Sequence, residues 1–417
     1  MEIVPITQKM KKVIESEKKR KVGFAGEVIK MMRLKNDYTQ EALAKGICSV
    51  SHVSKIENNQ VSSNIYILRE VSKVFNTDVK NLVYLNDSSL ILSKFAKALY
   101  YEDYALLNEI YEHISTVGEN PLLTLHSAIK QILEGKNDSL DEDLVNLQKL
   151  IKSTPSDYTK LVGLVAVMHH FNAHEYCEAF NVLKTLSELP TEITEMKTLE
   201  EIYKYICSEK IGCHSVSAHH YIRATQLLFE HPQTKYMMLL PLVHAYYTTL
   251  NQDEVGRNII EKMHLNQYER KYHNLFICTF VKAHTKKSDA DINQEMINKL
   301  DDNHTNTEYY QALITYDQYC KKHQIACNQP KLNIKEIPDH CLGAMHFKVE
   351  NITNEDEIAT YVKEIALPYA RNNQDIYYIN YFTTILVDYA NKKSRYKEAM
   401  MIDKKSKKII KKIRRVI

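Results

Sequence analysis

A short run of small polar and basic side chains follows Gly46 and could carry hydrogen-bonding chemistry. Ser49 can cap a helix that begins there, and the apolar residues of that helix would face inward. Ser51, His52 and Lys55 would then point outward from its first turns. Hydroxyl, imidazole and ammonium groups at a helix N-terminus can donate hydrogen bonds to base edges and phosphates in the major groove. The pattern therefore indicates contact with nucleic acid.

Motifs of enzyme active sites and of metal centres are missing from the sequence. It has no Gly-rich phosphate loop, nucleophile elbow, His-Glu-x-x-His or Gly-x-Gly-x-x-Gly. The pairs His169–His170 and His219–His220 are sequence neighbours, which point about 100° apart on a helix and cannot chelate one metal from a single face. The eight cysteines are scattered without a Cys-x-x-Cys pair. We therefore expect a protein that is not an enzyme and that binds no metal and no cofactor. We expect its cysteines to be buried thiols.

Four short helices would position the outward side chains. Apolar residues recur at helical spacing in bursts, which predicts a first helix ending near residues 36–37, a second between 39 and 46, a third from 49 and a fourth over 65–75. Thr39 can cap the second helix, Gly46 can end it, and Val53 and Ile56 would face inward from the third. Two short helices joined by a tight turn are the arrangement that lets a helix N-terminus enter the major groove.

These residues resemble the Cro/repressor-like helix-turn-helix family over about residues 24–82. The resemblance is carried by Thr39-Gln40, Leu43-Ala44 and Ser54-Lys55-Ile56-Glu57-Asn58, and Gly46-Ile47-Cys48-Ser49 is similar to the turn of the family's peptide-regulated members. It implies a double-stranded DNA operator as partner. It also implies that the residues at the family's contact positions touch phosphates or base edges; these are Gln40, Ser49, Ser51, His52 and Lys55.

The composition of the remaining chain predicts an all-α protein. Glycine and proline number 9 each among 417 residues, too few for the turns of a β-rich fold. After residues 86–89, which we expect to be a linker, amphipathic segments of roughly 12–18 residues follow one another to the end. The sequence thus predicts a helix-turn-helix domain over 1–85 with a basic N-terminal extension, followed over 90–417 by a superhelical array of TPR-like helical hairpins.

Three stretches illustrate the repeated hairpin of this array. They are residues 98–114, 169–186 and 389–404. In the latter two, Tyr176 and Tyr396 precede Ala179 and Ala399, and a tyrosine packed over a small residue would let two helices approach closely. The segment 320–338 is the longest expected connection. The concave face of such an array suits an extended peptide, because residues from successive helices converge on one groove.

Charge is concentrated at the two ends of the chain. Residues 1–60 carry 12 Lys/Arg against 7 Asp/Glu, residues 392–417 carry 12 against 2, and residues 61–391 are left with a net charge of −12. Basic ends suggest contact with a polyanion. No apolar run reaches the roughly 18 residues that cross a bilayer, and the N-terminus has no apolar signal region. We expect a soluble cytoplasmic protein without a membrane partner.

The last helix carries an apolar stripe that needs a covering surface. Its members are Ile402, Ile409, Ile413 and Val416, at spacings of seven, four and three. The stripe could cap the last repeat, pair with its symmetry mate in a homodimer, or lie on an anionic surface. We rank the cap first and the dimer second.

The array resembles a family of peptide receptors. The stretches 94–110 and 161–186, and Asp339-His340-Cys341 leading to His346-Phe347, are similar to the arbitrium receptors of temperate phages (AimR), within the Gram-positive quorum-sensing regulators. The resemblance covers most of residues 90–370. It implies a homodimer that binds a promoter controlling the lysis–lysogeny decision and is switched by a short imported peptide.

The same resemblance implies contacts for the peptide. Lys235 stands where a basic residue meets the peptide's carboxylate, and Asp339 where an acidic residue meets its arginine. Glu209 and Tyr246 stand where the family's asparagines hold the peptide backbone. Two alternatives stay open: a conjugation or sporulation regulator of the same superfamily, and a repeat scaffold that sequesters a partner protein.

Overall fold

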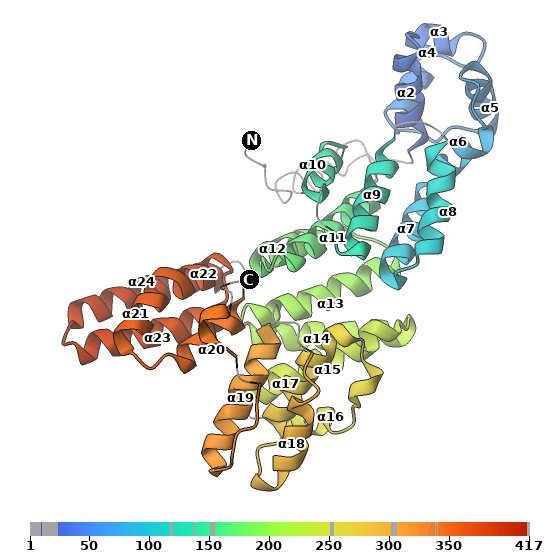
Figure 1. Cartoon of the computed structure of the whole chain (residues 1–417). Helices are drawn as coiled ribbons and strands as arrows, with labels where there is room; N and C mark the ends of the chain where they lie inside the picture. Colours follow the sequence, from blue (N-terminus) through green and yellow to red (C-terminus); the bar gives the residue numbers. More distant parts are fainter. Residues whose placement is uncertain are drawn as a thin grey trace. The chain divides into compact units, whose positions relative to one another are not determined.

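Helices account for every regular element in the part of the chain that the computed structural model describes (Figure 1). The structure describes residue 10 and residues 24–116, 120–136, 139–150, 155–250, 254–301, 307–330, 332–337, 339 and 341–414. The rest of the basic N-terminal extension, His340 and Val416 lie outside these ranges. The prediction of an all-α fold is confirmed. No helix in the described ranges is long and apolar enough to cross a bilayer.

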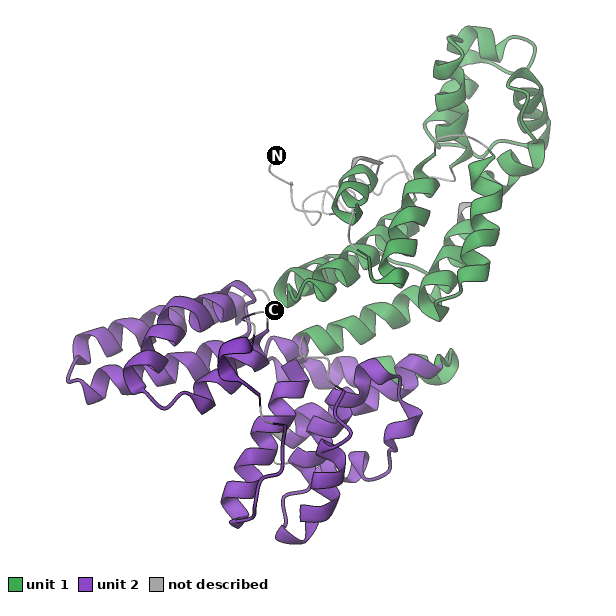
Figure 2. Ribbon diagram, in the orientation of Figure 1, with its two compact units in different colours: residues 1–207, 222–233 green, residues 208–221, 234–417 purple. Residues whose placement is uncertain are grey.

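The chain divides into two compact units (Figure 2). Unit 1 comprises residues 1–207 and 222–233, and unit 2 comprises residues 208–221 and 234–417. The boundary falls within α13 (Thr194–Lys210) and within α14 (His214–Glu230). The helix-turn-helix segment lies in unit 1 with the first helices of the array. The predicted domain division at residues 85–90 stays a prediction.

Five short helices follow one another over residues 25–86 of unit 1. They are α2 (Ala25–Lys35), α3 (Gln40–Ala44), α4 (Val50–Glu57), α5 (Ile65–Val74) and α6 (Val79–Asn86). The predicted caps of α3 and α4 are confirmed, since the side chains of Thr39 and Ser49 each accept a hydrogen bond from a backbone N–H of the first turn. Gly46 follows α3 with a φ of +78°, a left-handed conformation that glycine adopts without strain. Val53 and Ile56 of α4 are buried, as predicted.

The rest of unit 1 consists largely of helices that pack in consecutive pairs. They are α7 (Ser88–Tyr101), α8 (Tyr104–Ser115), α9 (Pro121–Glu134), α10 (Leu140–Leu150), α11 (Ser156–Asn172) and α12 (Tyr176–Leu186). α7 packs on α8, α9 on α10, and α11 on α12. The hairpins predicted over residues 98–114 and 169–186 are confirmed as α7–α8 and α11–α12.

Residues 86–89 are not the linker that their composition suggested. α6 ends at Asn86 and α7 begins two residues later, so only Asp87 lies outside a helix. The Asp87 carboxylate caps α7 by accepting a hydrogen bond from the Leu90 amide at 3.1 Å. Asn86 exchanges two hydrogen bonds with the backbone of Ser63, at 3.0 and 3.3 Å. The side chains of Asn86 and Asp87 therefore brace and cap helices.

Unit 2 continues the helical pattern. Its helices include α15 (Thr234–Leu250), α16 (Glu254–Ile260), α17 (His273–Ala283), α18 (Ala290–Ile297), α19 (Thr307–His323), α20 (Leu342–Asn351), α21 (Glu355–Tyr361), α22 (Leu367–Asn372), α23 (Ile376–Lys392) and α24 (Tyr396–Arg414), with 3-10 turns η1 (Leu265–Gln267), η2 (Arg270–Tyr272), η3 (Lys287–Asp289) and η4 (Ile334–Glu336) and the π-helical turn η5 (Val362–Ala366). The long connection expected at residues 320–338 is confirmed between α19 and α20, where the described residues contain only η4.

The hairpin turns share one backbone conformation. Glu102, His174 and Ser394 have φ angles of 55°, 62° and 59° in the turns α7–α8, α11–α12 and α23–α24. In each turn the following amide donates to the carbonyl five positions earlier, at 2.8–2.9 Å. This is the hydrogen bond that closes a helix C-terminus on a left-handed residue. Such turns explain how a chain with only 9 glycines ends so many helices.

The predicted tyrosine packing is wrong at the last hairpin. Tyr396 is 67% exposed, so it does not cover Ala399, which is itself buried. α24 still packs closely along α23 (Figure 1), because a small residue at position 399 permits the approach without an aromatic lid.

The buried stripe of α24 also differs from the predicted one. Ser406, Ile410 and Ile413 are buried, whereas Ile409 is only partly buried. The Ser406 hydroxyl accepts hydrogen bonds from Thr383 Oγ1 at 2.7 Å and from an Arg371 nitrogen at 3.0 Å, which fixes this side of the helix inward. The stripe covers α23, which is the capping arrangement ranked first. The homodimer stays a prediction.

Candidate functional site

α4 presents polar side chains to solvent along one side. Ser51 and Lys55 are exposed one helical turn apart, and His52 is half-buried. Ser49 is exposed as well, but its hydroxyl accepts a hydrogen bond from the His52 amide at 3.2 Å and lies 3.2 Å from the Ser51 hydroxyl. Ser51 and Lys55 are therefore placed to meet a ligand, while Ser49 mainly orders the start of the helix.

Gln40 takes part in a buried network that joins α2, α3 and α4. Its amide donates to Glu57 Oε2 at 2.8 Å. Arg33 donates to the same carboxylate through Nε at 2.5 Å and Nη2 at 3.0 Å, and to the Tyr38 carbonyl at 2.8 Å. The Glu57 side chain is 1% exposed, and its hydrogen bond raises the pKa of Arg33. Gln40 thus has an internal role, and its contact with DNA stays a prediction.

Sequence reasoning missed this buried pair. Glu57 was named only within the helix-turn-helix motif, and no role was predicted for Arg33. The available signal was the position of Glu57 directly after inward-facing Ile56 on α4, where a charge is buried only if it is paired.

The predicted peptide anchors Asp339 and Lys235 both have partners inside the protein. Asp339 Oδ1 accepts hydrogen bonds from Lys348 Nζ at 2.7 Å and from the Tyr361 hydroxyl. Burial and the bond to Asp339 raise the pKa of Tyr361. The Lys235 ammonium lies 5.3 Å from the centre of the Tyr236 ring at the start of α15. A peptide arginine at Asp339 would have to compete with Lys348.

Glu209, the third predicted contact, is also bound within unit 2. Its side chain is 7% exposed. One carboxylate oxygen accepts a hydrogen bond from Ser217 at 2.5 Å, and the other lies 2.6 Å from His214 Nδ1. The carboxylate therefore fastens the turn between α13 and α14.

Tyr246, the fourth predicted contact, leads toward a pocket. It is buried in α15, its hydroxyl donates to Gln311 Oε1, and burial raises its pKa. Gln311 in turn donates to the Tyr378 hydroxyl at 2.7 Å. The Lys282 ammonium lies 4.6 Å from the centre of the Tyr246 ring. Gln311 and Lys282 both line the pocket, although Tyr246 itself does not.

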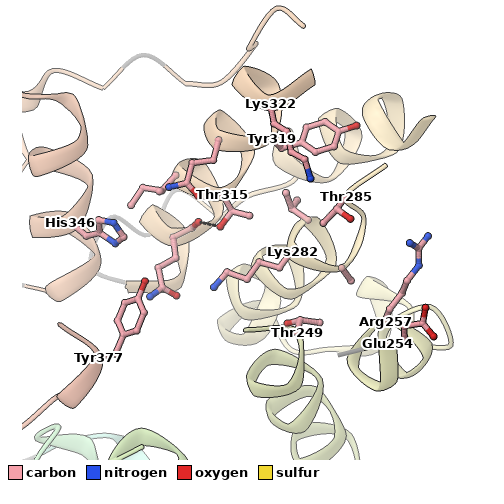
Figure 3. Close-up of a pocket in the computed structure, with 15 residues that line it drawn as sticks. Thr249, Glu254, Arg257, Lys282, Thr285, Thr315, Tyr319, Lys322, His346 and Tyr377 are labelled. Carbon is pink, nitrogen blue, oxygen red and sulfur yellow. Dashed lines mark hydrogen bonds between the residues drawn. The ribbon is translucent and has the colours of Figure 1, made fainter. Parts of the chain in front are cut away.

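This polar pocket in unit 2 has a volume of about 640 Å³ (Figure 3). Side chains from six helices converge on it: α15, α16, α17, α19, α20 and α23. The lining residues are Thr249, Glu254, Arg257, Val281, Lys282, Ala283, Thr285, Gln311, Ile314, Thr315, Gln318, Tyr319, Lys322, His346 and Tyr377. None of the four predicted peptide contacts is among them.

The pocket carries two cations that no carboxylate neutralises. Arg257 pairs with Glu261 at 2.7 Å, whereas Lys282 and Lys322 have no ion pair with any residue in the described ranges. Lys282, Tyr377 and His346 lie toward one side of the pocket, and Arg257 and Glu254 lie together at the other (Figure 3). The pocket is therefore suited to a polar ligand that brings negative charge to Lys282.

His346 is a nearly buried residue of the pocket wall. Its side chain is 8% exposed, and its Nε2 lies 3.5 Å from Glu350 Oε1. That contact and a hydrogen bond from Tyr381 lower the pKa of Glu350. Nδ1 of His346 is buried and meets no hydrogen-bond partner among the described residues.

The residues of this pocket were not identified from the sequence. Lys282 and His346 each stand among buried apolar residues of their helices, HNLFICTFVKA and LGAMHFKVEN. Nothing in these two segments marks the residues as partners, and only the folded helices bring both to one pocket.

Comparison with known proteins identifies the N-terminal domain. Residues 29–82 match the family described as Helix-turn-helix. No curated protein matches the chain. Among solved structures, the chain is similar to the apo form of the competence regulator ComR from Streptococcus vestibularis, at 12% identity over 72% of this chain and 98% of that chain, with a TM-score of 0.31. The protein is all-α and has an N-terminal helix-turn-helix domain in which α4 is the candidate DNA-reading helix.

Proposed function

We propose that this protein is a non-enzymatic transcription regulator that binds double-stranded DNA through α4 and responds to a short signalling peptide. The observation that carries the proposal is the helix-turn-helix domain at residues 29–82, with Ser51 and Lys55 exposed on a capped α4. Helices of this kind place their N-terminal residues against base edges. A homodimer in the cytoplasm fits this role, since paired half-sites mirror a two-fold axis.

The pocket of unit 2 is the peptide site that we favour. Convergence of six helices supplies the several contact groups that a short peptide needs for useful affinity. Its volume of about 640 Å³ lies in the range of ligand sites. Lys282 could meet a peptide carboxylate. Lys235 and Asp339 remain the anchors implied by the family resemblance.

The finer role that we propose is that of an arbitrium receptor, which controls the lysis–lysogeny decision of a phage. Its support is the resemblance of residues 94–110 and 161–186 to that family. Selection of operators from random duplexes, followed by calorimetry with the short peptides encoded next to the gene, tests both halves. If no operator is selected, the proposed DNA binding is wrong. If no peptide changes the affinity for the operator, the proposed response to a peptide is wrong.

The first prediction concerns base recognition by α4. The double variant Ser51→Ala/His52→Ala should lose discrimination among operator sequences by about 1–3 kcal/mol for each base pair that it no longer reads. Lys55→Ala should instead weaken binding to all duplexes evenly and lower the salt slope by about one. Binding to a panel of point-mutated operators measures both. Lys73→Ala, which removes an exposed lysine from α5, is the control, and unchanged discrimination in the double variant contradicts the assignment.

The second prediction concerns the peptide. Lys282→Gln should weaken peptide binding about tenfold or more, because a hydrogen bond to a charged group contributes about 1.5–3 kcal/mol. Operator affinity without peptide should not change, since α4 lies in the other unit. Lys299→Gln, at an exposed ion pair with Glu295, is the control in calorimetry. If Lys235→Ala and Asp339→Ala abolish the response while Lys282→Gln does not, the peptide binds elsewhere.

A further inference from the structure

The C-terminal half of α24 carries a dense basic surface. From residue 404 to residue 414 every exposed side chain is a lysine or arginine. These are Lys404, Lys405, Lys407, Lys408, Lys411, Lys412 and Arg414. We call the surface formed by these seven residues the α24 basic face. Lys404, Lys408 and Lys411 follow one another at helical spacing and form its middle.

The apolar residues of this half of the helix point the other way. Ile410 and Ile413 are buried, and Ser406 is fixed inward by its bonds to Thr383 and Arg371. The helix is thus held on α23 by one side, and the α24 basic face remains on the solvent side. The exposed large hydrophobic residues of α24, Tyr396, Met400 and Met401, lie before this stretch.

Most cations of the α24 basic face have no carboxylate partner among the described residues, unlike the lysines at the end of α23. Among the described residues, Lys407 alone of the seven has a carboxylate partner, Asp403 at 2.8 Å. At the end of α23, by contrast, Lys392 pairs with Glu355 at 2.6 Å and Lys393 with Asp356 at 3.0 Å. Mutual repulsion of unpaired cations costs free energy, and a polyanionic ligand would remove that cost.

We propose that the α24 basic face is a second nucleic-acid contact of this protein, which binds the phosphates of duplex DNA without sequence preference. The choice of DNA rests on the proposed function of α4. Eleven helical residues extend over about 15 Å. Duplex DNA presents about nine phosphate charges over that length, comparable to the charge of the face.

The structure favours DNA over a lipid surface. A helix that binds a membrane inserts an apolar side and keeps its cations at the headgroups. Here Ile410 and Ile413 are already buried against the protein, so the stretch 404–414 offers only charge. Phosphate binding requires charge alone, since it gains its free energy from released counterions.

The test compares charge-neutralised variants of the full chain. Lys408→Gln/Lys411→Gln removes two unpaired cations, Lys392→Gln/Lys393→Gln removes two paired ones, and Lys408→Arg/Lys411→Arg keeps the charge. Fluorescence anisotropy measures binding to a duplex of arbitrary sequence, about 30 base pairs long, between about 50 and 200 mM salt. Circular dichroism checks that each variant is folded.

The expected result is a salt slope lower by about two for Lys408→Gln/Lys411→Gln, with affinity at low salt roughly tenfold weaker. The Arg variant and the control pair should keep the parent's slope. If the Lys408→Gln/Lys411→Gln variant keeps the salt slope of the parent protein, the proposal is overturned. So does loss of binding to phosphatidylglycerol vesicles with DNA binding unchanged, which would assign the face to lipid.

Failure of this proposal differs from failure of the proposed function. If α4 does not read DNA, the Ser51→Ala/His52→Ala variant keeps the parent's operator preference, whatever happens at α24. If the α24 basic face does not bind DNA, sequence preference still responds to α4 variants, and only the slope on arbitrary duplexes stays unchanged.

Discussion

Glu57→Ala is expected to destabilise the helix-turn-helix domain by about 3–5 kcal/mol and to abolish operator binding at physiological temperature. The Glu57 carboxylate is almost fully buried and accepts two hydrogen bonds from Arg33 and one from Gln40. Removing it leaves the Arg33 guanidinium, 10% exposed, without its counter-charge between α2 and α4. An uncompensated buried charge costs far more than a lost surface contact.

Hydrogen exchange followed by mass spectrometry can locate this effect. Peptides from residues 25–86 should exchange faster in Glu57→Ala, while peptides from unit 2 should be unchanged. Glu70→Ala is the matched control, because Glu70 forms an i,i+3 surface pair with Lys73, which contributes about 0–1 kcal/mol. Equal protection in the two variants would falsify the claim that the network holds α2, α3 and α4 together.

Local signals in the sequence predicted local structure well. Thr39 and Ser49 cap α3 and α4 because a hydroxyl that reaches the first-turn amides depends only on residues within one turn. Gly46 takes its left-handed turn for an equally local reason. The first four helices of the helix-turn-helix segment, α2 to α5, and the hairpins α7–α8, α11–α12 and α23–α24, follow from apolar spacing, whereas α6 was not predicted.

Polar composition was a poor guide to connections. Residues 86–89 have the composition of a linker, but the same side chains that favour loops also cap helices, and Asp87 caps α7. Similarly, the sequence cannot distinguish Tyr176, which is partly buried, from Tyr396, which is exposed. The outcome depends on which helix lies opposite, and that is decided by tertiary packing.

The pocket could not be predicted for the same reason. Its lining extends from Thr249 to Tyr377 and comes from six helices, whose rotations about their own axes decide which side chains meet. The family resemblance placed the anchors by position in the chain. At Asp339 the structure shows Lys348 already bound, a contact between residues nine positions apart that no motif encodes.

Forcing extra volume into a packed site usually costs about 1–3 kcal/mol. Gly26→Ala is expected to destabilise the domain by about 3 kcal/mol or more. A Cβ at this position would lie 1.8 Å from the Ile56 carbonyl oxygen and 2.6 Å from Asn59 Oδ1. The Ile56 carbonyl belongs to the backbone of α4, so it cannot rotate away as a side chain can. α4 would have to move from α2, and the position of Ser51 and Lys55 relative to the domain would change with it.

Gly163→Ala is the matched control for this variant. Its Cβ would also meet close neighbours, at 2.5 Å, but these are the terminal atoms of the Leu186 and Met10 side chains, which can rotate. Alanine also favours a helix interior over glycine by about 1 kcal/mol, which offsets part of the cost. Thermal denaturation and operator binding should both be impaired by Gly26→Ala, and much less by Gly163→Ala. If Gly26→Ala binds operator like the parent and melts at the same temperature, α2 and α4 do not cross as closely as described, and the rigid support inferred for the reading helix is wrong.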